Sequence, residues 1–166
     1  MLLDAVMQMP AVADTMGSTM THYMELLQTN QPWNLILFMA IPVILAETLT
    51  ATEFFVVFNR LYDGPLRAFN KYVGSILGIY FLGVFLYLGL FVVPGIEWRG
   101  IIDIIAVGFY LSGVIFLFGI TLLEASVFGK KLDKDKHMYT HFLLLIGFLV
   151  VAHVAMIFGM ANPTLI

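Results

Sequence analysis

Glu47 and Glu53 interrupt an otherwise apolar stretch that runs from Trp33 to Phe58. A helix needs about 20 mostly apolar residues to cross a bilayer, and this stretch is long enough. A charged carboxylate in hydrocarbon is costly, so both side chains should face protein or a water-filled cavity. Six residues separate them, which on a helix is ~9 Å of rise and ~120° of rotation, so they need not share a partner. They are the first residues for which a function must be sought.

Glu124 and His141 are two further ionisable residues inside apolar stretches, and antiparallel packing places both near the depth of Glu53. A cluster of carboxylates and an imidazole can pass protons, ligate a divalent cation or orient a haem-ligating histidine. We therefore predict a relay for protons or cations that consists of Glu47, Glu53, Glu124 and His141. The alternative for the last three is a structural role, because residues near the headgroups can snorkel or pair. Glu47 lies deeper, which favours a functional role.

Histidine and methionine recur toward the other side of the membrane. His153, Met156 and Met160 share one face of the last apolar stretch, and His22 belongs to the N-terminal segment. Imidazole and thioether suit Cu(I) or an axial position on haem iron, so these four residues form the predicted metal or haem site, with haem b or copper as its cofactor. His141 and His153 are ~18 Å apart on one helix and cannot hold opposite faces of one haem. The alternative role for the methionines is packing, because their side chains adapt to irregular surfaces.

Four apolar stretches must position these side chains. With 61% hydrophobic and only 11% charged residues, the chain departs from soluble domains, of which about a quarter is charged. We predict an all-α polytopic membrane protein whose four transmembrane helices form an up-down bundle, because the connections are short. The predicted transmembrane helices are 33–58, 72–93, 101–128 and 137–160.

The N-terminal segment, residues 1–32, is less apolar and precedes the bundle. Within it we predict an amphipathic helix at the membrane interface over about residues 15–28, because three methionines fall on one stripe at helical spacing. They are Met16, Met20 and Met24. Residues 161–166 form a short tail on the same side of the membrane.

Composition and motifs also exclude several classes of function. A net charge of −3 argues against nucleic acid as a partner, because that binding needs clustered Lys and Arg. Without cysteine, the chain has no disulfide, thiolate metal site or cysteine nucleophile. The sequence has no phosphate-binding loop, zinc-protease motif or serine elbow, so we expect a protein that is not an enzyme.

The basic residues predict the orientation in the membrane. Seven of the eight lie around the first and third connections, and only Arg99 lies on the other side. The positive-inside rule then places both termini outside the cytoplasm, which for a bacterial inner membrane is the periplasm. The seven residues are Arg60, Arg67, Lys71, Lys130, Lys131, Lys134 and Lys136.

Three functions follow from these patterns. The first is a small inner-membrane protein that binds or moves a metal ion or haem, because only this function uses both the outer His/Met layer and the inner Glu/His layer. The second is a non-catalytic subunit of a membrane complex or a homo-oligomer, since Gly74 and Gly78 permit close helix packing. The third is a proton- or cation-coupled small transporter, which would need dimerisation because four spans without a repeat make a thin transporter.

Overall fold

The computed structural model describes residues 20–61, 63–127 and 132–165, and regular structure within these ranges is entirely helical. In this part of the chain, four helices are long and apolar enough to cross a membrane. They are Trp33–Phe58, Pro65–Gly95, Ile101–Glu124 and Lys134–Gly159. The predicted all-α fold with four spanning helices is confirmed, and the protein is a multi-pass membrane protein.

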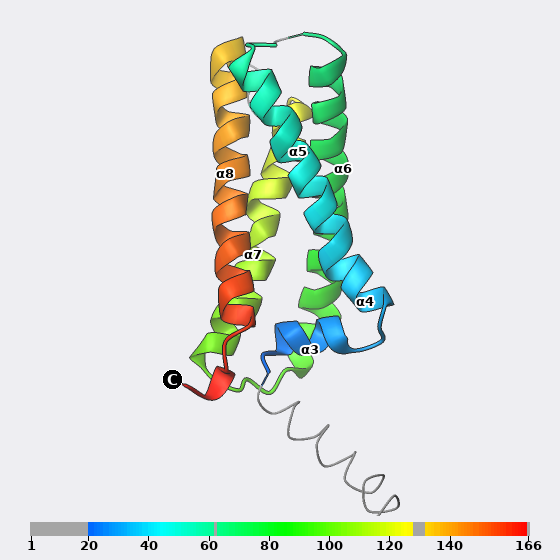
Figure 1. Cartoon of the computed structure of the whole chain (residues 1–166), viewed down its shortest axis with the longest axis vertical. Helices are drawn as coiled ribbons and strands as arrows, with labels where there is room; N and C mark the ends of the chain where they lie inside the picture. Colours follow the sequence, from blue (N-terminus) through cyan, green and yellow to red (C-terminus); the bar gives the residue numbers. More distant parts are fainter. Residues whose placement is uncertain (1–19, 62, 128–131, 166) are drawn as a thin grey trace, which may run out of the picture.

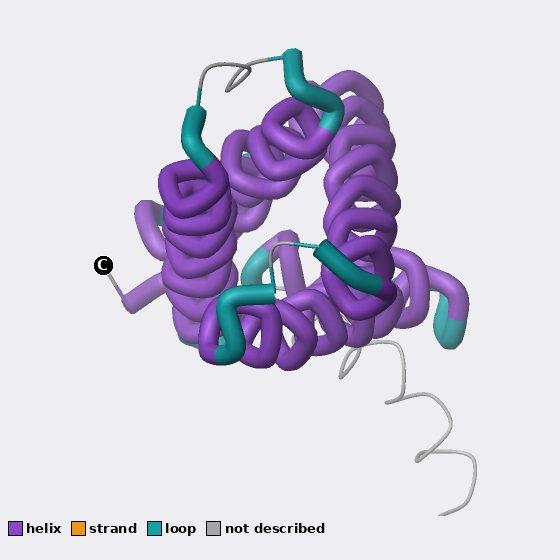
Figure 2. Tube along the Cα trace, turned by 90° about the horizontal axis from the view of Figure 1, so that it is seen from above, coloured by secondary structure: helices purple, strands orange, loops and turns teal. Residues whose placement is uncertain are grey.

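The spans form an up-down bundle in which sequence neighbours run antiparallel (Figure 1). Figure 2 shows them arranged in a ring when viewed along the bundle. The first span joins α4 (Trp33–Leu35), the π-helical turn η1 (Ile36–Ala40) and α5 (Ile41–Phe58). The second joins α6 (Pro65–Tyr87), the π-helical turn η2 (Leu88–Val92) and the 3₁₀ turn η3 (Val93–Gly95). The third and fourth are α7 (Ile101–Glu124) and α8 (Lys134–Gly159), and the 3₁₀ turn η4 (Pro163–Leu165) follows.

The second span begins at Pro65 rather than at the predicted Tyr72. Gly64 precedes it with a φ of 137°, a conformation that residues with a Cβ rarely adopt. Proline then suits the first helical position, because its φ is already helical and no intrahelical hydrogen bond is lost there. The third span ends at Glu124, earlier than predicted, and the fourth begins at Lys134, also earlier than predicted.

A short helix, α3 (His22–Gln28), lies across one end of the bundle (Figure 1). The Thr21 hydroxyl caps it by accepting a hydrogen bond from the Met24 N–H at 3.4 Å, and donates to the Gly159 carbonyl at 2.6 Å. The predicted amphipathic helix is thus seen from His22 onward, and its first part, residues 15–19, lies outside the described residues.

The two ends of the bundle are named here by their contents. At the basic end, α5 and α7 finish and α6 and α8 begin; the opposite end, covered by α3, is the α3 end. The first span crosses the bundle obliquely, beside α8 at the basic end and beside α6 at the α3 end (Figure 1). Val57 accordingly lines a pocket with Phe142 of α8, whereas the Leu37 carbonyl accepts a hydrogen bond from Tyr80 of α6.

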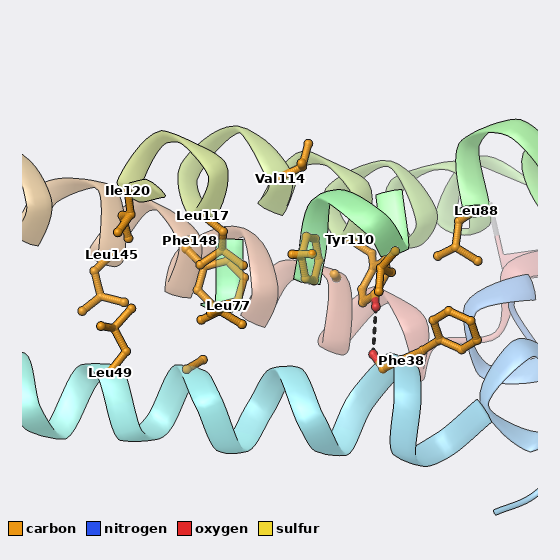
Figure 3. Packing of buried hydrophobic residues seen from close by; sticks show 14 of the residues in the cluster. Phe38, Leu49, Leu77, Leu88, Tyr110, Val114, Leu117, Ile120, Leu145 and Phe148 are labelled. Carbon is orange, nitrogen blue, oxygen red and sulfur yellow. Dashed lines mark hydrogen bonds between the residues drawn. The ribbon is translucent and has the colours of Figure 1, made fainter. Parts of the chain in front are cut away.

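Apolar side chains fill the bundle between its two ends (Figure 3). The leucine and isoleucine side chains of this cluster that are at most 1% exposed are Leu49, Leu77, Leu117, Ile120 and Leu145. Gly78 lets α6 approach α7, because a Cβ at this position would collide with the Leu117 carbonyl. The small-residue pair Gly74 and Gly78 therefore serves packing within the chain. Large apolar side chains such as Leu77 and Leu117 lie between the polar groups of the two ends.

Candidate functional site

Glu53, Glu124 and His141 come together at the basic end from three different helices. The Nδ1 atom of His141 lies 3.1 Å from Oε1 of Glu53, and its Nε2 atom lies 3.7 Å from Oε1 of Glu124. All three side chains are buried. The predicted inner cluster therefore exists as a spatial unit, with the imidazole between the two carboxylates.

Helical spacing explains why these side chains point inward. Glu53 lies on the buried stripe of α5 that also contains Leu49 and Val56. His141 shares the buried stripe of α8 with Leu145, four residues later. Glu124 is the last residue of α7, so it lies at the level where that helix leaves the membrane. Apolar packing thus fixes the three helices relative to one another, and the three ionisable side chains lie in contact range as a result.

Arg67 completes the cluster, although the sequence pattern assigned it only to the basic residues that predict the orientation in the membrane. Its guanidinium donates to Glu124 at 2.6 Å and to the Asn70 side chain at 3.2 Å, and lies 4.0 Å from Glu53. It also approaches Nδ1 of His137 at 3.3 Å. The signal was available in the sequence: Pro65 marks a helix start, and from there Arg67, Asn70 and Gly74 share one face at i, i+3 and i+7.

Asn70 fixes the backbone on which this cluster is built. Its side-chain amide donates to the Thr52 hydroxyl at 2.9 Å and to the Leu49 carbonyl at 3.3 Å. Asn70 is fully buried, so these bonds join α6 to α5 inside the bundle, where a hydrogen bond is stronger than at the surface. Asn70 therefore holds Glu53 and Arg67 in register across two helices.

The Glu53–His141 pair is buried without aligned hydrogen bonds. Among the described residues, neither carboxylate oxygen of Glu53 and neither ring nitrogen of His141 has a hydrogen bond of acceptable geometry. The 3.1 Å separation is within ion-pair range, but the ring and the carboxylate are not aligned for donation. Buried polar groups almost always have partners, so a pair of this kind indicates a site for a proton, an ion or a water molecule.

A pocket of about 400 Å³ lies beside this cluster at the basic end. Arg67, Glu124 and His137 line it, together with the exposed residues Asp63 and Lys134 at its mouth. Lys71 also lines it, half exposed, with Nζ 3.8 Å from Glu124. Glu124 and Arg67 therefore stand between the pocket and the fully buried Glu53–His141 pair.

The other predicted site residues do not join this cluster. Glu47 is exposed on the outer surface of α5. His153, Met156 and Met160 are exposed on α8, and Nδ1 of His153 lies 2.6 Å from the Leu149 carbonyl of its own helix. In the described ranges, no three acidic or histidine side chains are grouped so as to hold a metal ion.

Comparison with protein-family models matches residues 18–166 to a family of unknown function, DUF6803. The chain belongs to this family. Neither the curated proteins nor the solved structures contain a match. The matched region extends over the basic-end cluster and over α3, so both belong to the family's domain.

His22, the remaining predicted ligand, is engaged at the α3 end. Its Nδ1 atom lies 2.5 Å from Oδ2 of Asp103, and its backbone N–H donates to Oδ1 of the same residue at 2.7 Å. Arg99 donates to Glu25 at 2.6 Å and to the Met20 carbonyl at 2.6 Å. Asp103 is fully buried, so these contacts dock α3 on the start of α7.

Proposed function

We propose that this is a proton-binding membrane protein without enzymatic activity. In this proposal the Glu53–His141 pair holds one proton and exchanges it, by way of Glu124, with water at the basic end. The observation that supports it most directly is the burial of a carboxylate and an imidazole that lack aligned hydrogen bonds. A proton shared between them would supply a missing donor without requiring extra space.

The charge balance of the cluster supports a proton as its ligand. With both carboxylates ionised and both histidines neutral, Glu53 and Glu124 carry two negative charges, and Arg67 carries one positive charge. Lys71 compensates little, because its side chain is 49% exposed and screened by water. An unbalanced buried charge is strongly destabilising, and one proton on the Glu53–His141 pair removes it.

The geometry favours a proton over the predicted metal ion or haem. The predicted soft ligands divide between two places, since His22 is engaged by Asp103 while His153 lies exposed on α8. Between the Glu53 level and the α3 end, the buried side chains of the described residues include no carboxylate or histidine that could continue a proton path through the bundle. We therefore place the proton exchange at one end, and keep metal binding and coupled transport as predictions from the sequence.

We further propose that the protein resides in a bacterial inner membrane with the basic end in the cytoplasm and both termini in the periplasm. The distribution of Lys and Arg supports this orientation. A reporter enzyme that is active only in the periplasm, fused after Ile166, would be active under this proposal. An inactive C-terminal fusion, with an active fusion inserted after Asp63, would reverse the orientation.

Infrared difference spectroscopy of the purified protein during a pH titration tests the proton site. We expect a carbonyl-stretch band of a protonated, buried carboxyl group that appears as the pH falls and is absent in Glu53→Gln. The His141→Gln variant should move the pH at which the band appears, because the proton loses its second carrier. Asp63→Asn is the matched control, since Asp63 is an exposed carboxylate at the same end and forms a 2.8 Å ion pair with Lys134.

Two outcomes would overturn the proposal. The first is an identical carboxyl band in wild type and Glu53→Gln, with both proteins monodisperse. The second is a band that depends on added Na⁺ or a divalent cation and not on pH, which would assign the site to a metal cation.

A further inference from the structure

Glu47 lies on the outer surface of the bundle, within the first span. It shares an exposed stripe of α5 with Val43, at i−4, and Phe54, at i+7. Among the described residues, it has no hydrogen bond or ion pair. Lipid chains cannot provide a partner for a carboxyl group, so its position in a single chain is unfavourable.

His153 has the corresponding position on α8. One ring nitrogen faces the carbonyl of Leu149, which leaves Nε2 directed away from its own helix. His153 follows Phe142 by eleven residues, or ~20° of rotation, and Phe142 lines the pocket that α8 shares with α5. His153 therefore faces the α5 side of α8, at a level where α5 has moved away toward α6 (Figure 1).

Glu47 and His153 thus belong to the same side of the molecule. Glu47 points ~80° from Val57, which faces α8, and ~140° from Thr52, which faces α6. Measured from the Glu53–His141 level, Glu47 lies ~9 Å and His153 ~18 Å toward the α3 end. Side chains lean toward the N-terminus of their helix, so on these antiparallel helices the two lean toward each other's level.

We propose that this α5–α8 face binds a second copy of the chain, with Glu47 of each protomer paired with His153 of the other. A two-fold axis along the membrane normal keeps every residue at its own depth in the membrane. It also makes the contact reciprocal, so that Glu47 of each copy meets His153 of the other. Carboxyl and imidazole complement each other, because either one can donate to the other in the neutral form of the pair. Each dimer then contains two such pairs, and both exposed polar groups are satisfied.

Among the described residues, the other faces of the bundle offer no comparable pair of polar groups to a second copy. The small-residue face of α6 is already filled by α7, through Gly78 and the Leu117 backbone. Away from the basic end, exposed positions on α6 and α7 include Ile79 and Ile115, which are apolar and compatible with lipid. The polar pair therefore singles out the α5–α8 face.

A mixing experiment distinguishes pairing between chains from pairing within one chain. Homodimers of Glu47→His would place histidine opposite histidine, and homodimers of His153→Glu would place carboxylate opposite carboxylate. When the two variants are co-expressed with tags of different size, the mixed dimer has complementary groups at both contacts. Within either variant chain, by contrast, the two positions carry identical groups, so pairing inside one chain cannot be restored by mixing.

Cross-linking in membranes provides the readout, because the chain has no cysteine of its own. Cysteine introduced at Val150, an exposed position of α8 three residues before His153, is joined by a bifunctional maleimide. Cysteine at Ile79 is the control on α6. We expect each variant alone to form on the order of tenfold less cross-linked dimer than wild type, because two intramembrane polar pairs are replaced by like groups facing each other. The mixture of the two variants should regain the wild-type level.

Three outcomes would overturn the proposal. They are a monomer at all expression levels with the Val150 cysteine, equal cross-linking at Ile79, and a dimer that neither single variant weakens. A dimer that both variants weaken but that mixing does not restore would assign Glu47 and His153 to contacts within one chain, and would also reject the proposed interface.

Discussion

The hydroxyl of Tyr110 donates a 2.8 Å hydrogen bond to the carbonyl of Phe38, the group that Pro42 leaves without a backbone donor. The π-helical turn just before Pro42 frees a second carbonyl, because the Ile41 N–H donates to Ile36 instead of Leu37. The Tyr80 hydroxyl donates to that Leu37 carbonyl at 2.8 Å. Two tyrosines from α6 and α7 therefore replace two missing backbone donors in a span where water is scarce.

Replacing Tyr110 with phenylalanine should destabilise the bundle. The change removes one buried hydrogen bond and leaves the Phe38 carbonyl unpaired, which costs about 1–3 kcal/mol in the free energy of unfolding. Titration with a denaturing detergent, followed by circular dichroism, measures the change. Tyr139→Phe is the control, because Tyr139 is exposed on α8 and has no hydrogen bond among the described residues. Equal stability of the two variants would contradict this role for Tyr110.

The spanning helices were predictable because hydrophobic length is a local property, and the run from Trp33 to Phe58 has the same bounds in the sequence analysis and in the structure. The tyrosine contacts were not predictable in this way. Pro42 predicts that the Phe38 carbonyl lacks its backbone hydrogen bond, but no local pattern identifies the residue of another helix that donates to this carbonyl instead. Such a contact depends on how α7 packs against the first span, which is a property of the whole bundle.

Gly78→Ala should separate α6 from α7. A Cβ at this position collides with the backbone of Leu117, which cannot move away as a flexible side chain would. Overpacking of this kind costs about 1–3 kcal/mol in the free energy of unfolding, or more. Gly83→Ala is the matched control on the same helix, because a Cβ there meets nothing within 4 Å. We expect the control to be neutral or slightly stabilising, since alanine favours a helix over glycine. Two variants of equal stability would show that the helices have room to adjust.

Docking of α3 should fail at alkaline pH. Burial raises the pKa of Tyr23 to about 12, whereas an ordinary tyrosine titrates near 10. A raised pKa means that the docked state disfavours the phenolate, so docking is complete below pH 10 and weakens as the pH rises through 12. The full loss amounts to roughly 3 kcal/mol. Hydrogen exchange of the α3 amides measures it, and Tyr23→Phe should remove the transition. A transition at the same pH in that variant would assign it to another group.

At the basic end, the sequence indicated Glu53, Glu124 and His141 but not their cation. The reason is that residues 61–71 contain a turn signal and several charges, a composition typical of a connection between spans. The helix in fact starts at Pro65, which turns Arg67 into the bundle and gives it buried carboxylates as partners. Charge alone therefore could not show that Arg67 is buried and Lys71 is half exposed. That difference depends on where α6 starts and on which of its faces points into the bundle.

Arg67→Gln should destabilise the protein far more than Lys71→Gln. Arg67 is 13% exposed, and its loss leaves Glu124 buried without its 2.6 Å partner, which costs about 3–5 kcal/mol. Lys71 approaches the same carboxylate at 3.8 Å but is 49% exposed, so its loss should cost at most about 1 kcal/mol. Adding Glu124→Gln to Arg67→Gln should recover much of the stability, because the unpaired charge is then gone. A double-mutant cycle in the same detergent titration measures this coupling. Additive effects would mean that Arg67 acts through Asn70 and α6 alone, and that the two carboxylates are neutralised in another way.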